Sequence, residues 1–72
     1  MKIDVEKMDL IIAEKGMMLK DVAEQSGLSE NSFRNIRKGV SIPRLKTIGR
    51  IANTLGVGVQ EIIKEGDADS ND

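Results

Sequence analysis

The fold is decided by residues 19–39, Leu-Lys-Asp-Val-Ala-Glu-Gln-Ser-Gly-Leu-Ser-Glu-Asn-Ser-Phe-Arg-Asn-Ile-Arg-Lys-Gly, which predict two short helices joined by a tight turn. The first helix is expected at about 19–26 and the second at about 30–38. Gly27 directly follows the first helix, where a glycine ends a helix in the left-handed conformation at little steric cost. Ser29 suits the N-cap of the second helix. The apolar positions that hold the two helices to the core are Leu19, Val22, Ala23, Phe33 and Ile36.

A polar stripe runs along the outward face of the second predicted helix, which Gly39 ends. Asn31, Arg34, Asn35 and Lys38 recur at i, i+3, i+4 and i+7, so they share one face. An Asn amide can pair with N6 and N7 of adenine, and an Arg can reach a guanine or a phosphate. Side chains of this kind contact base edges and phosphates. The best base-reading candidates are Asn31 and Asn35, followed by Arg34 and Glu30, and Ser32 is short enough to approach the sugar-phosphate chain.

Glu30 allows two interpretations, because it is the first exposed residue of this helix. A carboxylate there is repelled by phosphate, yet it can accept a hydrogen bond from the N4 amino group of cytosine. An acid in the first turn also stabilises the positive end of the helix dipole. The dipole interpretation is favoured.

Composition excludes several classes of function. The 72 residues make one small domain, and they contain neither cysteine nor histidine. Disulfides, zinc or redox centres and common nucleophile–base pairs are therefore not expected, and we predict no enzyme, no metal, no cofactor and no small-molecule ligand. The N-terminus is too charged for a signal peptide, and no apolar run approaches membrane length. A cytoplasmic location is expected.

The positive charge is concentrated in one stretch, although the whole chain has a net charge of −1. Residues 1–28 carry a net −2, residues 29–50 a net +5, and residues 51–72 a net −4. A basic stretch that includes the outward-facing helix is the charge pattern expected of a nucleic-acid-binding face, although a solvent-exposed helix face gives the same pattern.

The remaining sequence predicts an all-α, compact bundle of five short helices. The first helix is expected at about 4–15, with Asp4 as N-cap and Gly16 as terminator, and the fourth begins with Pro43 in its first turn and ends at Gly56. A short fifth helix is expected near 58–63. Residues 66–72 lack apolar anchors and are expected to be a disordered acidic tail beyond a domain at 1–65. The buried stripes are Val5, Met8, Ile11 and Ile12, then Leu45, Ile48, Ile51, Ala52 and Leu55, with Met17 and Met18 as core or crevice fillers.

These positions together resemble the Cro/C1-type (XRE-like) helix-turn-helix repressors of bacteria and phages, over about residues 5–65. The resemblance implies a lambda-repressor-like DNA-binding domain that presents its third helix to the major groove of double-stranded DNA. It also implies that the loop after this helix rides over the DNA backbone. The matching residues are Val22-Ala23, Gly27-Leu28-Ser29, Phe33, Ile36, Gly39, Pro43, Leu45, Ile51-Ala52, Leu55-Gly56-Val57 and Glu61-Ile62, and the implied phosphate contacts at the loop are Lys38, Ser41 and Arg44.

Three departures from the family pattern bear on DNA contacts. One is Glu30, described above, and the other two concern residue 19 and the pair at residues 12 and 37. The family often has a phosphate-clamping Gln where this chain has Leu19, so that contact is expected to be weaker or to pass to Lys20. The family also commonly pairs an Arg late in the first helix with a Glu near the end of the third. Here these positions are Ile12 and Arg37, which leaves no buried orphan charge and is expected to free Arg37 for solvent or phosphate.

The predicted function is a sequence-specific DNA-binding transcriptional regulator, with repression as the expected action. One such domain reads few base pairs, so a weak homodimer through the fifth helix, near Val57, Val59 and Ile63, is expected. The alternatives are an antitoxin-like protein, or an interaction module on the same fold that has lost DNA binding. Leu19, Glu30 and the acidic total favour that loss, and the basic stretch opposes it.

Overall fold

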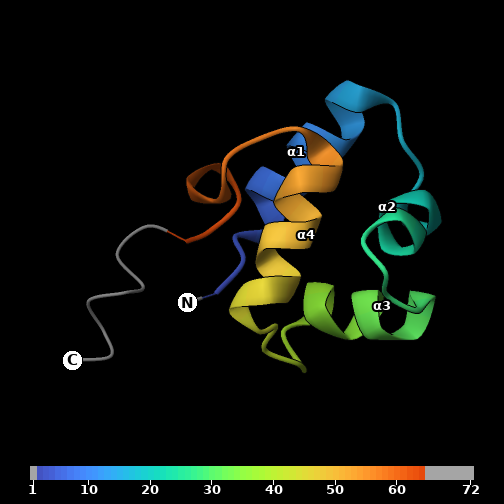
Figure 1. Cartoon of the computed structure of the whole chain (residues 1–72), viewed down its shortest axis with the longest axis vertical. Coiled ribbons are helices and arrows are strands. Elements are labelled where there is room, and N and C mark those ends of the chain that lie inside the picture. The colour runs from blue at the N-terminus through green and yellow to red at the C-terminus, as the bar shows by residue number, and fades with distance from the viewer. Residues whose placement is uncertain (1, 65–72) are drawn as a thin grey trace.

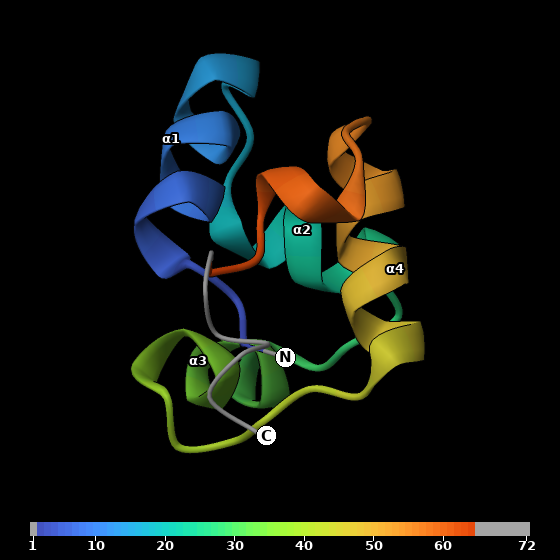
Figure 2. The same cartoon turned by 90° about the vertical axis from the view of Figure 1, so that its left-hand side faces the viewer.

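The computed structural model describes residues 2–64, which form four α-helices and one 3₁₀ turn. The elements are α1 (Val5–Lys15), α2 (Leu19–Gln25), α3 (Glu30–Lys38), α4 (Leu45–Leu55) and η1 (Val59–Glu61). In two views at right angles, α3 and the loop after it lie at one end of the molecule, and the C-terminal ends of α1 and α4 lie at the other (Figures 1 and 2). The predicted all-α bundle is confirmed.

The core is built from the apolar stripes of all four α-helices. Phe33, the single aromatic residue of the chain, is 2% exposed, and Ile51 is completely buried. Burial of such side chains is the main favourable term in the folding of a small domain. The other buried apolar side chains are Ile3, Met8, Ile12, Val22, Ala23, Ile36, Ile48, Ala52, Leu55 and Ile62.

The turn between α2 and α3 needs a glycine because of its backbone conformation. Gly27 has φ +78°, a conformation that L side chains rarely adopt. A Cβ at this position would also lie 3.0 Å from Nη1 of Arg50, whose guanidinium covers the turn from α4. Behind the turn, Oγ of buried Ser26 donates to Oγ1 of Thr54 at 3.1 Å, which ties the end of α2 to α4. The orientation of α2 is therefore fixed by α4.

Ser29 caps α3 as predicted, because its Oγ accepts a 3.0 Å hydrogen bond from the backbone N–H of Ser32. We expect Ser29→Ala to cost about 1 kcal/mol of unfolding free energy, since an N-terminal donor of α3 loses its partner. Urea unfolding followed by circular dichroism measures this loss. Ser41→Ala is the matched control, because Ser41 is an exposed loop residue. Equal losses in the two variants would show that the cap contributes nothing specific.

The predicted fifth helix is shorter than expected. Only Val59–Glu61 forms a 3₁₀ turn, and Ile63 then pairs with Ile3 in an isolated antiparallel bridge. The Asp4 N–H donates to the Ile62 carbonyl at 2.8 Å, and the Lys64 N–H donates to the Lys2 carbonyl at 2.9 Å. These backbone bonds tie residues 62–64 to the segment before α1, so these residues are not available to continue a helix.

Several residues at helix beginnings are more exposed than predicted. Pro43 was predicted in the first turn of α4, but it lies in the loop before that helix. Arg44, whose backbone is extended, is the N-cap. Leu45 and Leu19 are 69% and 41% exposed, since each is the first residue of its helix and precedes the stripe that meets the core. Met18, predicted to fill a crevice, is also exposed, whereas Met8 and Met17 do pack in or against the core. The acidic tail predicted at 66–72 lies outside the described residues.

Candidate nucleic-acid interface

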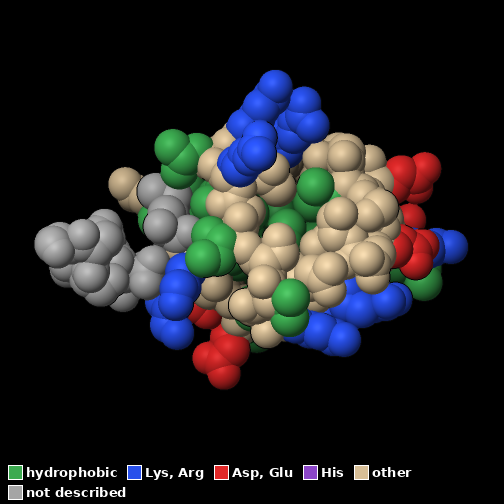
Figure 3. Space-filling model, turned by 90° about the horizontal axis from the view of Figure 1, so that it is seen from below, with side chains coloured by type: hydrophobic (Ala, Val, Ile, Leu, Met, Phe, Trp, Pro, Cys, Tyr) green, Lys and Arg blue, Asp and Glu red, His purple; other side chains and the backbone are tan. Residues whose placement is uncertain are grey.

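The surface around α3 forms one end of the molecule. Figure 3 views this end directly: Lys and Arg side chains lie near its edges together with some Asp and Glu side chains, and largely uncharged surface with a few hydrophobic side chains lies between them. Phosphate groups of duplex DNA flank its grooves, whereas base edges line them. An uncharged surface with Lys and Arg side chains along parts of its edge therefore suits a groove that lies across α3.

The predicted polar stripe of α3 lies on the outside of the protein. Asn31, Arg34 and Lys38 are exposed, and Asn35 is half-buried. The opposite face of the helix carries buried Phe33 and Ile36. The stripe is thus held by the core, and its side chains are available to reach a partner. Contact between these side chains and bases stays a prediction.

Glu30 and the first turns of α2 share a shallow hollow of about 110 Å³ beside α3. Its lining is Leu19, Lys20, Ala23, Glu30, Phe33, Arg34 and Arg37. Lys20 and Arg34 therefore face the same space from neighbouring helices, which suits a shared phosphate contact. Ser32 is exposed, and its Oγ accepts a 2.9 Å hydrogen bond from Oγ of Ser29, so its hydroxyl is already part of the helix cap.

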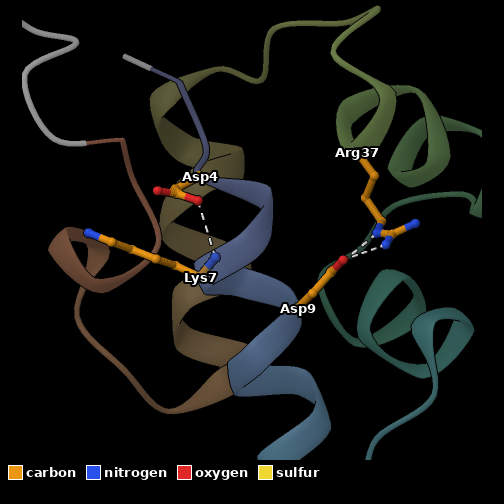
Figure 4. A network of polar contacts seen from close by, with 4 residues as sticks. All are labelled: Asp4, Lys7, Asp9 and Arg37. Carbon is orange, nitrogen blue, oxygen red and sulfur yellow. Dashed lines mark hydrogen bonds and ion pairs between the residues drawn. The ribbon is translucent and has the colours of Figure 1, made fainter.

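Arg37 is not free, and the expectation that it would be was wrong. Its Nη2 lies 2.6 Å from Oδ2 of Asp9, and its Nε donates to Oδ1 at 3.3 Å. Figure 4 shows the two side chains pointing toward one another from α3 and α1. Both are partly exposed, at 28% for Arg37 and 39% for Asp9, so the pair stabilises the fold by about 0–1 kcal/mol.

Sequence reasoning missed this pair because the partner is displaced along α1. The expected position was residue 12, but Ile12 is buried, and the acid stands three residues earlier on the same helical face. The charges are also reversed relative to the family pattern, since the acid is on α1 and the base is on α3. A search for acids at i−3 and i−4 from the expected position would have found Asp9.

The loop between α3 and α4 places three of the predicted phosphate contacts together. Lys38, Ser41 and Arg44 are all exposed, and Arg44 directly precedes α4. The N–H groups of Val40 and Ser41 donate to the Asn35 carbonyl at 3.0 and 3.2 Å, which ties the start of the loop to α3. The loop also exposes two apolar side chains that sequence reasoning did not single out, namely Val40 and Ile42.

The surface predicted for self-association is less apolar than expected. Val57, Val59 and Ile63 are partly buried and pack against the core of the same chain. Their apolar area is therefore largely used within the domain, and a dimer through this face stays a prediction.

Comparison with known proteins agrees with this geometry. The family model of the Cro/C1-type HTH DNA-binding domain matches residues 7–65, most of the chain. No curated protein matches the sequence. Among the described residues, none of the helices has the length and hydropathy needed to cross a membrane. The match covers all four α-helices from the third residue of α1 onward, including the turn at Gly27 and the whole of α3. The chain therefore belongs to the Cro/C1-type helix-turn-helix DNA-binding domain family.

Proposed function

We propose that this protein is a sequence-specific transcriptional regulator that acts as a repressor and reads the major groove of DNA with α3. The observation that carries the proposal is the polar stripe of α3, which is presented outward by a helix whose inner face is buried. Asn31 and Asn35 act as base readers, with Arg34 beside them. Repression follows from steric exclusion, because a protein seated on a promoter blocks access to it.

Positive side chains from α2, from the end of α3 and from the residue before α4 fix the position of the protein on DNA. Lys20 approaches from α2, Lys38 stands at the end of α3, and Arg44 precedes α4. Such contacts supply affinity without sequence information. Their arrangement supports a docking mode in which the backbone contacts hold α3 in the groove. DNA-associated location in the cytoplasm, and assembly as a dimer on a two-fold site, belong to the same proposal.

Selection from a random duplex library tests the proposal. We expect the protein to enrich one short sequence, in two symmetric copies about 34 Å apart if it binds as a dimer. Affinity for the enriched duplex should exceed that for a scrambled duplex of equal composition by at least 10³-fold, as is typical of specific DNA-binding proteins. Retention of DNA without enrichment of any sequence would contradict sequence-specific regulation and favour an interaction module with residual charge attraction.

Arg44→Ala tests the backbone contacts. We expect weaker binding of enriched and scrambled DNA by equal factors, because a phosphate contact is lost and no base contact changes. A plot of log affinity against log salt concentration should become shallower by about 0.9. Lys15→Ala is the matched control, since it removes the same charge at the end of α1 that lies opposite α3 (Figure 1). A change in sequence preference for Arg44→Ala would show that this residue reads bases.

A further inference from the structure

The Asp9–Arg37 pair lies where it can act on DNA binding as well as on folding. Arg37 lines the 110 Å³ hollow that Lys20 and Arg34 also line. It lines a second groove of about 240 Å³ as well, between the N-terminal segment and the loop after α3. The basic side chains of that second groove are Lys2, Arg37 and Lys38. Arg37 is thus the cation that the two hollows share.

Asp9 holds this shared cation in place. The Asp9 carboxylate accepts hydrogen bonds from both Nε and Nη2 of Arg37. Such a two-point contact fixes the plane of the guanidinium. Arg37 belongs to the last turn of α3, so the contact also anchors the C-terminal end of that helix to α1. With its charge matched by Asp9, Arg37 attracts phosphate less than Lys20, Arg34 or Lys38 does.

We propose that Asp9 is a positioning residue for DNA discrimination: it acts through Arg37 to orient α3 and to keep this central cation from binding phosphate indiscriminately. The inference rests on the proposed function, because it concerns the same DNA-binding face. The proposal predicts an unusual effect for the replacement of an acidic residue near DNA. Removing the carboxylate should strengthen binding to random DNA and lower the preference for the enriched sequence.

The test compares Asp9→Asn with the wild-type protein on enriched and scrambled duplexes at several salt concentrations. We expect several-fold tighter binding to scrambled DNA, and a plot of log affinity against log salt that is steeper by about 0.9, since the released guanidinium gains one phosphate contact. Affinity for the enriched duplex should change less, so the ratio between the two falls. Glu14→Gln is the matched control, because Glu14 is an exposed carboxylate on α1 and its replacement changes the net charge equally.

The exchanged pair Asp9→Arg with Arg37→Asp separates positioning from direct contact. The exchange keeps both the combined side-chain length and the net charge, and it should restore the preference that Asp9→Asn loses. A preference that stays low in a folded exchange variant would overturn the positioning role and assign Arg37 itself to the DNA. Equal weakening on both duplexes for Asp9→Asn would also overturn it. Failure of the wild-type protein to prefer any sequence would instead overturn the proposed function.

Discussion

Phe33→Ala should cost about 3–5 kcal/mol of unfolding free energy, the largest loss of stability that we expect from a single side chain. Phe33 is 2% exposed, and it joins the inner face of α3 to the core. A chain of 72 residues has a total stability of roughly 4–11 kcal/mol, so this loss removes much of it. Urea unfolding monitored by circular dichroism gives the value directly.

Phe33→Leu is the matched variant for this measurement. It keeps a large apolar side chain at the same position, so the remaining cavity is smaller and the loss should be clearly less than for Ala. DNA binding of the Leu variant should persist, since its outward face is unchanged. A loss below about 1 kcal/mol for Phe33→Ala would show that α3 is not held by the core in the manner described.

Asn31→Ala and Asn35→Ala should each cost about 1–3 kcal/mol of binding free energy on the enriched duplex and little on scrambled DNA. Each change removes an amide that can pair with a base edge, and neither changes the charge of the protein. The salt dependence of binding should therefore stay as in the wild-type protein. Fluorescence anisotropy titrations on both duplexes supply the two affinities.

Asn53→Ala is the matched control for these two variants. Asn53 is exposed near the C-terminal end of α4, away from the end of the molecule where α3 lies (Figure 1). Its replacement should leave both affinities unchanged. If the α3 variants lost equal affinity on both duplexes, Asn31 and Asn35 would be contacting phosphates and sugars instead of bases.

Much of this fold could be predicted because local signals agree with each other. Asp4 and Ser29 cap α1 and α3 with their side chains, and Gly16, Gly39 and Gly56 end helices in the left-handed conformation. Caps of this kind depend on residues within one turn, so a single sequence contains the information. The apolar stripes of α1, α3 and α4 are similarly local.

The elements that were mispredicted depend on distant partners. Ile62 and Ile63 have the composition of a helix end, but backbone hydrogen bonds and a bridge pair this stretch with the segment before α1. Arg37 is engaged by Asp9, 28 residues earlier in the chain. Leu45 has an apolar side chain at helical spacing, yet it is exposed, and the buried stripe of α4 begins only at Ile48. Such pairings are fixed by the packing of whole helices, which periodicity alone does not encode.

In the candidate site, too, the features set by local sequence could be predicted, and those set by the packing of distant helices could not. The outward stripe of α3 follows from helical spacing, since burial of Phe33 and Ile36 fixes which face is outside. The hollow between Lys20 and Arg34 and the engagement of Arg37 follow from how α1 and α2 pack against α3.

The central claim is that α3 reads DNA sequence, and parallel library selections with the wild-type protein and the folded Asn31→Ala/Asn35→Ala variant test it most directly. We expect the wild-type protein to enrich a defined site, and the double variant to lose preference at particular base pairs within it. Arg44→Ala, run beside them, should enrich the wild-type site. The account is contradicted if the double variant enriches the same sequence with the same preference at every position.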